Sequence, residues 1–345
     1  GMGFKILHLL VLEDNNTLDS ELDEYIKEMG TTGSFDILIY KTNSFYTVAG
    51  LRKIAFQVLP DELLQRIKSF GPNLTFCFDI VAAGIIGHHL TCPKIAWIGD
   101  LYFQTFWYHA LYSVREKLTE CIRLPSVWLV CHYWKAAYKT ILSNFEMVVV
   151  ASKSSELILQ NLRIQSTYLP YPWPVAIDSI FSPAQTKEPK PSFLFFGTLS
   201  ALGSRSAFHF LLDSIYPRLV HLYGKGGFQI SICGLREIPN WVTKKLIWIK
   251  EIRYLGFVDD LGALMSSCHA VIVPIDIPIG NRSRIITAMA LGGLVIAHKN
   301  TSLANPELIN GVTCYLAYNA KQFIKYMKMA YEKPEITKSI IENAR

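Results

Sequence analysis

Short apolar runs alternate with amphipathic stretches along the first half of the chain. The runs are bounded by Asp, Pro, Gly and polar clusters, which is typical of buried parallel strands. The stretches between them carry apolar residues at helical spacing. We expect strands at residues 4–12, 35–40, 74–79, 94–98 and 147–151, and helices at residues 17–29 and 59–70.

The same alternation begins again after a proline-dense segment, residues 169–183, which predicts a linker. Strands are expected at residues 192–196, 229–233 and 270–273, and a helix at residues 207–219. Strands that alternate with helices indicate a parallel sheet covered on both faces. We predict an α/β fold of two doubly wound, Rossmann-like domains, residues 1–170 and 171–345. Ligands would lie at the carboxyl ends of the strands, in a cleft across which the domains face each other.

The loop after the strand at residues 270–273 carries the first candidate chemistry. It reads Gly280-Asn281-Arg282-Ser283-Arg284 and leads directly into an Ala- and Met-rich helix. The amino end of a helix offers unpaired N–H groups and the positive end of its dipole, and arginines add fixed charge. The loop therefore predicts an anion site.

This loop and its helix resemble the nucleotide-sugar-binding domain of GT-B glycosyltransferases of the group 1 type. That family has the pattern G-x-R-x-[KR]-[IL]-x-E-A-M-A-x-G-x-P-V-[VI] after a G-[FY]-V-x-D element. Thr287 stands where the family has a glutamate, and Ile279 stands at the position of its partner acid. The residues that match are Gly256, Phe257, Val258, Asp260, Gly280, Arg282, Arg284, Ile285, Ala288, Met289, Ala290, Gly292, Val295 and Ile296.

The resemblance implies a hexosyltransferase-like glycosyltransferase. It would move a sugar from a nucleotide-diphospho-sugar, bound by the C-terminal domain, to a hydroxyl of a glycan or lipid-linked acceptor, bound by the N-terminal domain. Because both family acids are replaced, a non-catalytic nucleotide- or sugar-binding protein of the same fold is the alternative. A sugar epimerase or phosphorylase of this fold is a third reading.

Sugar transfer requires stabilisation of the charge that develops on the leaving diphosphate, which arginines and helix amino ends can provide. Arg282 and Arg284 suit this role, although both also suit a solvated helix start. Asp100 ends the strand at residues 94–98 and could orient or deprotonate the acceptor hydroxyl. It equally suits the N-cap of the aromatic helix that follows.

Further donor contacts are expected where other strands end. Gly197 permits close backbone approach, and by resemblance its loop reaches the donor phosphates. Arg205 also suits a surface loop, Phe257 suits a core position, and Glu307 suits either ribose hydroxyls or a helix start. The expected donor-binding residues are Gly197, Thr198, Arg205, Gly234, Phe257, Val258, Gly280, Asn281, Ser283 and Glu307.

Composition limits which cofactors, partners and cellular location we expect. Seven cysteines are scattered without C-x-x-C pairs, and the histidines lack metal-ligand spacing, so we expect no metal and no cofactor beyond the nucleotide sugar as substrate. The N-terminus begins a strand rather than a signal peptide, which favours a cytoplasmic protein. The net charge of +6 fits an anionic substrate or an acidic membrane surface, and we expect no nucleic-acid partner.

Residues 97–138 are unusually aromatic, and basic residues lie among them. This combination suits a membrane interface, a lipid-linked acceptor, sugar stacking or a buried core. We expect residues 102–112 to border the acceptor side of the cleft, and we expect peripheral contact with the inner membrane face. The aromatic residues are Trp97, Tyr102, Phe103, Phe106, Trp107, Tyr108, Tyr112, Trp128, Tyr133, Trp134 and Tyr138.

Overall fold

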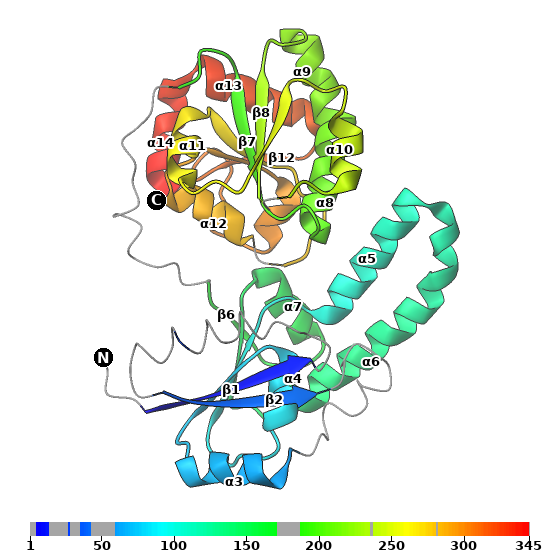
Figure 1. Cartoon of the computed structure of the whole chain (residues 1–345), viewed down its shortest axis with the longest axis vertical. Helices are drawn as coiled ribbons and strands as arrows, with labels where there is room; N and C mark the ends of the chain where they lie inside the picture. The colour runs from blue at the N-terminus through cyan, green and yellow to red at the C-terminus, as the bar shows by residue number, and fades with distance from the viewer. Residues whose placement is uncertain are drawn as a thin grey trace. The chain divides into compact units, whose positions relative to one another are not determined.

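The computed structural model describes residues 5–13, 27, 35–42, 59–170, 187–234, 237–280 and 282–344. The chain divides into two compact units. The first consists of Gly1–Ala151 and Glu156–Tyr168, and the second of Ser152–Ser155 and Leu169–Arg345. Both units are α/β structures with parallel sheets (Figure 1). Most of the expected linker at residues 169–183 and nearly all of the expected helix at residues 17–29 lie outside the described residues.

A six-stranded parallel sheet forms the centre of the second unit. Its strand order is β12-β11-β10-β7-β8-β9, which is the order of a dinucleotide-binding Rossmann sheet. The direction of winding reverses between β7 and β10, which pair directly, and ligands of such sheets bind at this switch point. The strands are β7 (Ser192–Phe196), β8 (Gln229–Cys233), β9 (Ile252–Gly256), β10 (Ala270–Val273), β11 (Val295–His298) and β12 (Tyr315–Ala317).

Helices lie on both sides of this sheet (Figure 1). The expected helix at residues 207–219 belongs to a longer helical stretch from Leu202 to Tyr223, which is interrupted by one π-helical turn. The helical elements are α8 (Leu202–Phe210), the π turn η3 (Leu211–Ile215), α9 (Tyr216–Tyr223), α10 (Asn240–Leu246), α11 (Leu261–Ser267), α12 (Ser283–Ala290), the short 3-10 helix η4 (Lys299–Leu303), α13 (Ala320–Glu332) and α14 (Pro334–Ala344).

The first unit contains a four-stranded parallel sheet of order β3-β4-β5-β6 and a separate parallel pair, β1-β2. Its strands are β1 (Ile6–Glu13), β2 (Phe35–Thr42), β3 (Thr75–Phe78), β4 (Lys94–Ile98), β5 (Met147–Val150) and β6 (Thr167–Tyr168). Its helices are α3 (Asp61–Phe70), α4 (Ile80–Ile86), α5 (Tyr102–Glu116), the 3-10 helix η1 (Leu118–Arg123), α6 (Leu124–Leu142) and α7 (Lys153–Asn161).

The aromatic segment of the first unit serves mainly as core. Phe103, Tyr112, Trp134 and Tyr138 are buried. They belong to α5 and α6, which pack side by side as an antiparallel pair (Figure 1). The rings of Phe103 and Tyr138 meet edge to face, with centroids 5.4 Å apart. Trp128, on the outer side of α6, is exposed instead.

The seven cysteines are all free thiols. Five are buried and Cys92 is partly buried, whereas Cys121, in η1, is exposed. Burial raises the pKa of Cys77 to about 12 and the pKa of Cys233 and Cys314 to about 11. The buried thiols are therefore protonated and unreactive at neutral pH.

Candidate functional site

Three neighbouring strands of the second unit end in glycine. The glycines that follow or close β7, β8 and β9 are Gly197, Gly234 and Gly256. Their backbones are hydrogen-bonded across the sheet. The Gly197 N–H donates to the Cys233 carbonyl oxygen, and the Gly234 N–H donates to the Gly256 carbonyl oxygen, each at 2.9 Å. A Cβ atom on Gly234 would lie 2.6 Å from the Gly197 carbonyl oxygen. Gly234 therefore lets the ends of β7 and β8 lie close together, which a side chain at this position would prevent.

The loop after β10 is tied down by Arg282. This side chain is buried, and its Nη2 donates to the Ile277 carbonyl oxygen at 2.6 Å. The Arg282 backbone N–H donates to Oδ1 of Asn305 at 3.4 Å, and Gly280 adopts a φ of 74°. Arg282 thus holds the loop in the position from which α12 begins.

Arg284 points to the switch point of the sheet. Its Nη2 donates to the buried Ser204 hydroxyl, on α8, at 2.6 Å. A Cβ atom on Gly197 would lie 2.7 Å from its Cζ, so the guanidinium packs directly on that glycine. Burial lowers the pKa of Arg284 to about 10, which leaves the side chain charged at neutral pH.

No carboxylate forms an ion pair with Arg284 among the residues that the structure describes. We refer to Gly197, Ser204, Gly234, Gly256 and Arg284 as the strand-end site. The two arginines of the predicted anion loop therefore differ: one is an internal anchor, and the other offers its charge at the carboxyl ends of the strands.

The other expected donor residues are arranged less uniformly. Thr198 is exposed beside Gly197. The Arg205 guanidinium lies over the Trp241 ring, 5.4 Å from its centroid. Ser283 is the exposed first residue of α12, and Asn281 lies outside the described residues.

Two alternative interpretations from the sequence are wrong. Phe257 is 59% exposed after the end of β9, so it is not a core residue, and Val258 beside it is partly buried. Glu307 is exposed and lies in a turn rather than at a helix start; its carbonyl oxygen accepts a hydrogen bond from the Thr313 hydroxyl at 2.8 Å.

In the first unit, Asp100 is exposed at the carboxyl end of β4. The helix α5 begins at Tyr102, and its N-cap position is occupied by Leu101 without a side-chain cap. The interpretation of Asp100 as the N-cap residue is therefore wrong by one position. Its carbonyl oxygen accepts from the hydroxyl of the buried Tyr138 at 3.5 Å.

Sequence reasoning missed Asp79, at the end of the neighbouring strand β3. Its φ of 77° is unusual for a residue other than glycine. Its carboxylate caps α4 by accepting from the Val81 N–H at 3.2 Å, and it also accepts from the Tyr102 hydroxyl at 2.8 Å. An Asp between an apolar strand and an apolar helix was the available signal. Burial raises the pKa of Tyr138, and the charges of Asp79 and Asp100 raise it further.

Part of the second unit matches a known protein family. Residues 190–333 match the family model described as Glycosyl transferases group 1, and no curated protein matches the sequence. HepE of Anabaena in complex with UDP is 13% identical, with a TM-score of 0.63 over 99% of this chain and 93% of that one.

Two further solved structures have the same fold. A glycosyltransferase from Rickettsia africae is 15% identical, with a TM-score of 0.60 over 99% of this chain and 92% of its own. The lipopolysaccharide outer core galactosyltransferase WaaB is 12% identical, with a TM-score of 0.53 over 98% and 95%. The GT-B fold and the family resemblance expected from the sequence are both confirmed.

Proposed function

We propose that the chain, a group 1 glycosyltransferase with the GT-B fold, moves a sugar from a nucleotide-diphospho-sugar to an acceptor hydroxyl without a metal ion. The observation that carries this proposal is the position of Arg284, a partly buried cation whose partner is the Ser204 hydroxyl. A buried charge without a counter-charge is costly. A diphosphate above Gly197 would supply the anion.

In this reaction Arg284 and the amino end of α12 stabilise the charge that grows on the leaving diphosphate. Arg282 acts through the loop, which it holds by the bond to Ile277. The nucleotide would bind at the strand ends marked by Gly197 and Gly234. Phe257 and Val258 would lie beside the base, and Glu307 would bind the ribose hydroxyls.

The sugar end of the donor meets no carboxylate at the two family positions. Thr287 turns back on its own helix, where its hydroxyl donates to the Ser283 carbonyl oxygen at 3.0 Å. Ile279 is buried. Rate acceleration is therefore assigned to stabilisation of the diphosphate rather than to a paired acid.

The acceptor hydroxyl, on a glycan or a lipid-linked saccharide, is assigned to the first unit. Asp100 is exposed after β4 and would accept or orient the acceptor proton. Asp79 already accepts two hydrogen bonds, so it is better suited to holding Tyr102 in place.

Thermal shift with nucleotide sugars tests the donor assignment. HepE has been solved with UDP and with UDP-glucose, so UDP-glucose is the first choice, and GDP- and ADP-glucose are the comparisons. Ligand at about 100 times its dissociation constant should add about 2.7 kcal/mol to the free energy of unfolding. Release of UDP from the bound donor then measures turnover. The proposal fails if no nucleotide sugar raises the melting temperature.

A further inference from the structure

The turn between α10 and β9 presents large apolar side chains to solvent. Trp248 is 88% exposed and Ile247 is 66% exposed, and Leu255, on the edge strand β9, is exposed as well. Tryptophan at this level of exposure is uncommon in a folded protein, where its large ring is normally mostly buried. We call Lys244, Lys245, Trp248, Lys250 and Arg253 the basic corner.

All charged residues of the basic corner are positively charged. Its three lysines and its arginine are all exposed, and none forms an ion pair with a residue that the structure describes. The one acid between residues 238 and 258 is Glu251, which is buried.

The carboxylate of Glu251 is hydrogen-bonded within the second unit. Its carboxylate accepts from the Gly226 N–H at 2.8 Å and from the Tyr216 hydroxyl at 2.9 Å. Burial opposes its ionisation, but these hydrogen bonds outweigh burial and hold the pKa of Glu251 below its ordinary value. The carboxylate is thus ionised and hydrogen-bonded to interior partners, and it forms no ion pair with the lysines of the basic corner.

The basic corner lies away from the strand-end site. Residues 247–250 precede β9, whereas Gly256 ends it. Because the strands are parallel, Gly197 and Gly234 lie at the carboxyl ends of the strands, and the amino end of β9 lies at the opposite end of the sheet. Five residues at about 3.3 Å each separate the two ends by roughly 15 Å. Trp248 and Lys250, which precede β9, therefore lie away from the strand-end site.

We propose that the basic corner docks the protein on an anionic lipid bilayer, with Trp248 and Ile247 inserted among the headgroups. Lysines attract a negative leaflet while tryptophan favours the interface between headgroups and acyl chains. None of the described helices is long and apolar enough to cross a bilayer, and docking by the corner requires none. This proposal assigns a surface to the membrane contact expected from the sequence, and it does not depend on the donor assignment.

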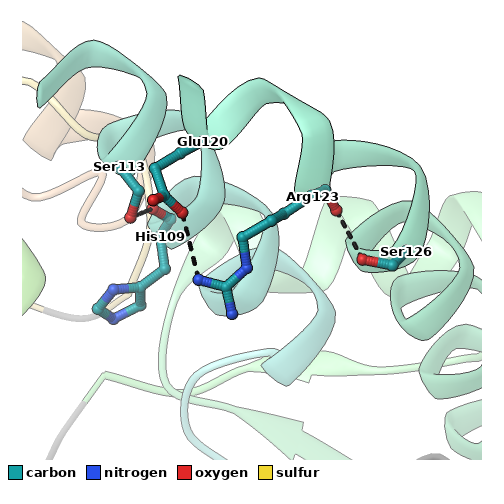
Figure 2. Close-up of polar contacts among 5 residues, drawn as sticks. All are labelled: His109, Ser113, Glu120, Arg123 and Ser126. Atoms are coloured by element: carbon teal, nitrogen blue, oxygen red, sulfur yellow. Dashed lines mark hydrogen bonds and ion pairs between the residues drawn. The ribbon is translucent and has the colours of Figure 1, made fainter. Parts of the chain in front are cut away.

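The tip of the α5–α6 pair is the competing surface. It also exposes apolar residues, among them Leu118, Ile122 and Trp128. Its charges, however, are mixed: Nη1 of Arg123 pairs with Oε2 of Glu120 at 3.2 Å (Figure 2). The Ser113 hydroxyl donates to the His109 carbonyl oxygen in α5, and the Ser126 hydroxyl donates to the carbonyl oxygen of Arg123, the last residue of η1 (Figure 2). Because the acids offset the cations, this tip lacks complementarity to an anionic surface, and Trp128 serves as a matched control.

Flotation with lipid vesicles tests the proposal. Purified full-length protein is mixed with vesicles of phosphatidylcholine alone, or of phosphatidylcholine with phosphatidylglycerol. We expect binding to the anionic vesicles alone, and we expect it to weaken with salt. Each lysine near an anionic surface contributes about fivefold to partitioning. Lys244→Glu with Lys245→Glu should therefore weaken binding by roughly a hundredfold or more, and Trp248→Ala should weaken it severalfold.

Two controls make the result specific. Lys321→Glu with Lys325→Glu, two exposed lysines of α13, changes the net charge equally. Trp128→Ala removes the other tryptophan that is exposed among the described residues. Both should bind vesicles as the unaltered protein does. No binding to anionic vesicles, or equal loss in the α13 variant, overturns the proposal. The thermal shift with UDP should be unchanged in the corner variants, so failure of the donor assignment is scored separately.

Discussion

At the scale of single residues, donor binding should depend most on Arg284. Its replacement by alanine removes a charge-assisted hydrogen bond to a phosphate. Such a bond is worth on the order of 1.5–3 kcal/mol, so UDP should bind Arg284→Ala roughly ten- to hundredfold more weakly. Titration calorimetry with UDP measures the change. Arg284→Lys keeps the charge without the planar fork and should fall between the two.

Arg282→Ala is the control, because Arg282 lies two residues away and donates inward to Ile277. Its loss leaves a buried carbonyl without a donor and should lower the free energy of unfolding by about 1–3 kcal/mol, with a smaller effect on UDP affinity. Unchanged affinity in both variants would remove the donor from the strand-end site. Equal losses in two folded variants would mean that the roles are assigned wrongly.

Two buried histidines make the stability of the second unit sensitive to mild acid. Nδ1 of His269 accepts from the Ser192 N–H, and Nδ1 of His298 accepts from the Asn300 N–H, both at 3.2 Å. Burial lowers the pKa of both rings below the ordinary histidine value of about 6.5. The unfolded chain therefore binds more protons below that pH, and stability is lost as the pH falls through it.

We expect the urea midpoint to drop between about pH 6.5 and 5, a window in which exposed carboxyls change little. His269→Gln, whose amide oxygen can still accept from Ser192, should show a shallower pH dependence. A midpoint that is flat over this window in the unaltered protein would contradict the assignment of neutral, accepting rings.

The sequence identified the two arginines of the loop but not the different roles that they have. The partners of Arg282 and Arg284 are the Ile277 carbonyl and the Ser204 hydroxyl, and only folding brings Ser204, eighty residues away, into reach. The role of Asp79 could not be predicted for a related reason. Its positive φ is set by the surrounding structure and not by its residue type.

At the scale of elements, the turn between β7 and α8 requires a glycine. Gly197 has a φ of 129°, and an added Cβ would lie 2.7 Å from Cζ of Arg284. Gly197→Ala should displace the guanidinium and weaken UDP binding by roughly tenfold or more, as loss of its hydrogen bond would. Calorimetry with UDP measures this.

Gly71→Ala is the matched control for backbone strain. Gly71 ends α3 with a φ of 65°, and an added Cβ there has nothing within 4 Å. The variant should lose about 1 kcal/mol of stability and keep its UDP affinity. If Gly197→Ala also keeps its affinity, close packing of Arg284 on that glycine is unimportant for the donor.

Strands were predicted better than helices. Apolar runs at residues 192–196, 229–233 and 270–273 coincide with β7, β8 and β10, because a strand buried on both faces is apolar throughout. The helix expected at residues 207–219 was too short. Its first turn contains Gly203 and the buried Ser204. A Cβ atom on Gly203 would lie 3.2 Å from Nη1 of Arg282, so this turn packs on the loop after β10, a contact that periodicity cannot reveal.

At the scale of the whole molecule, we expect donor binding to be independent of divalent metal. The described residues contain no group of three His, Cys, Asp or Glu side chains that could hold a metal ion, and Arg284 offers positive charge instead. The UDP dissociation constant should be equal in EDTA and in Mg²⁺ or Mn²⁺. Affinity that disappears in the chelator and returns with Mn²⁺ would show that the diphosphate is held by metal.

The fold of the molecule could be predicted further than its chemistry. Alternation of apolar runs with amphipathic stretches predicted the parallel sheets, and the loop of Arg282 and Arg284 carried the family resemblance. The domain boundary between residues 170 and 171 remains a prediction, as does the cleft. The choice of acceptor rests on a surface whose shape no local pattern encodes.

The distribution of thiols gives this protein one native site for chemical labelling. Cys121, in η1, is the one exposed cysteine, while five others are buried and Cys92 is partly buried. A maleimide dye under native conditions should therefore attach mainly to the tip of the α5–α6 pair. Such a label would report on the surroundings of that tip as nucleotide, acceptor or vesicles are added, without any engineered cysteine.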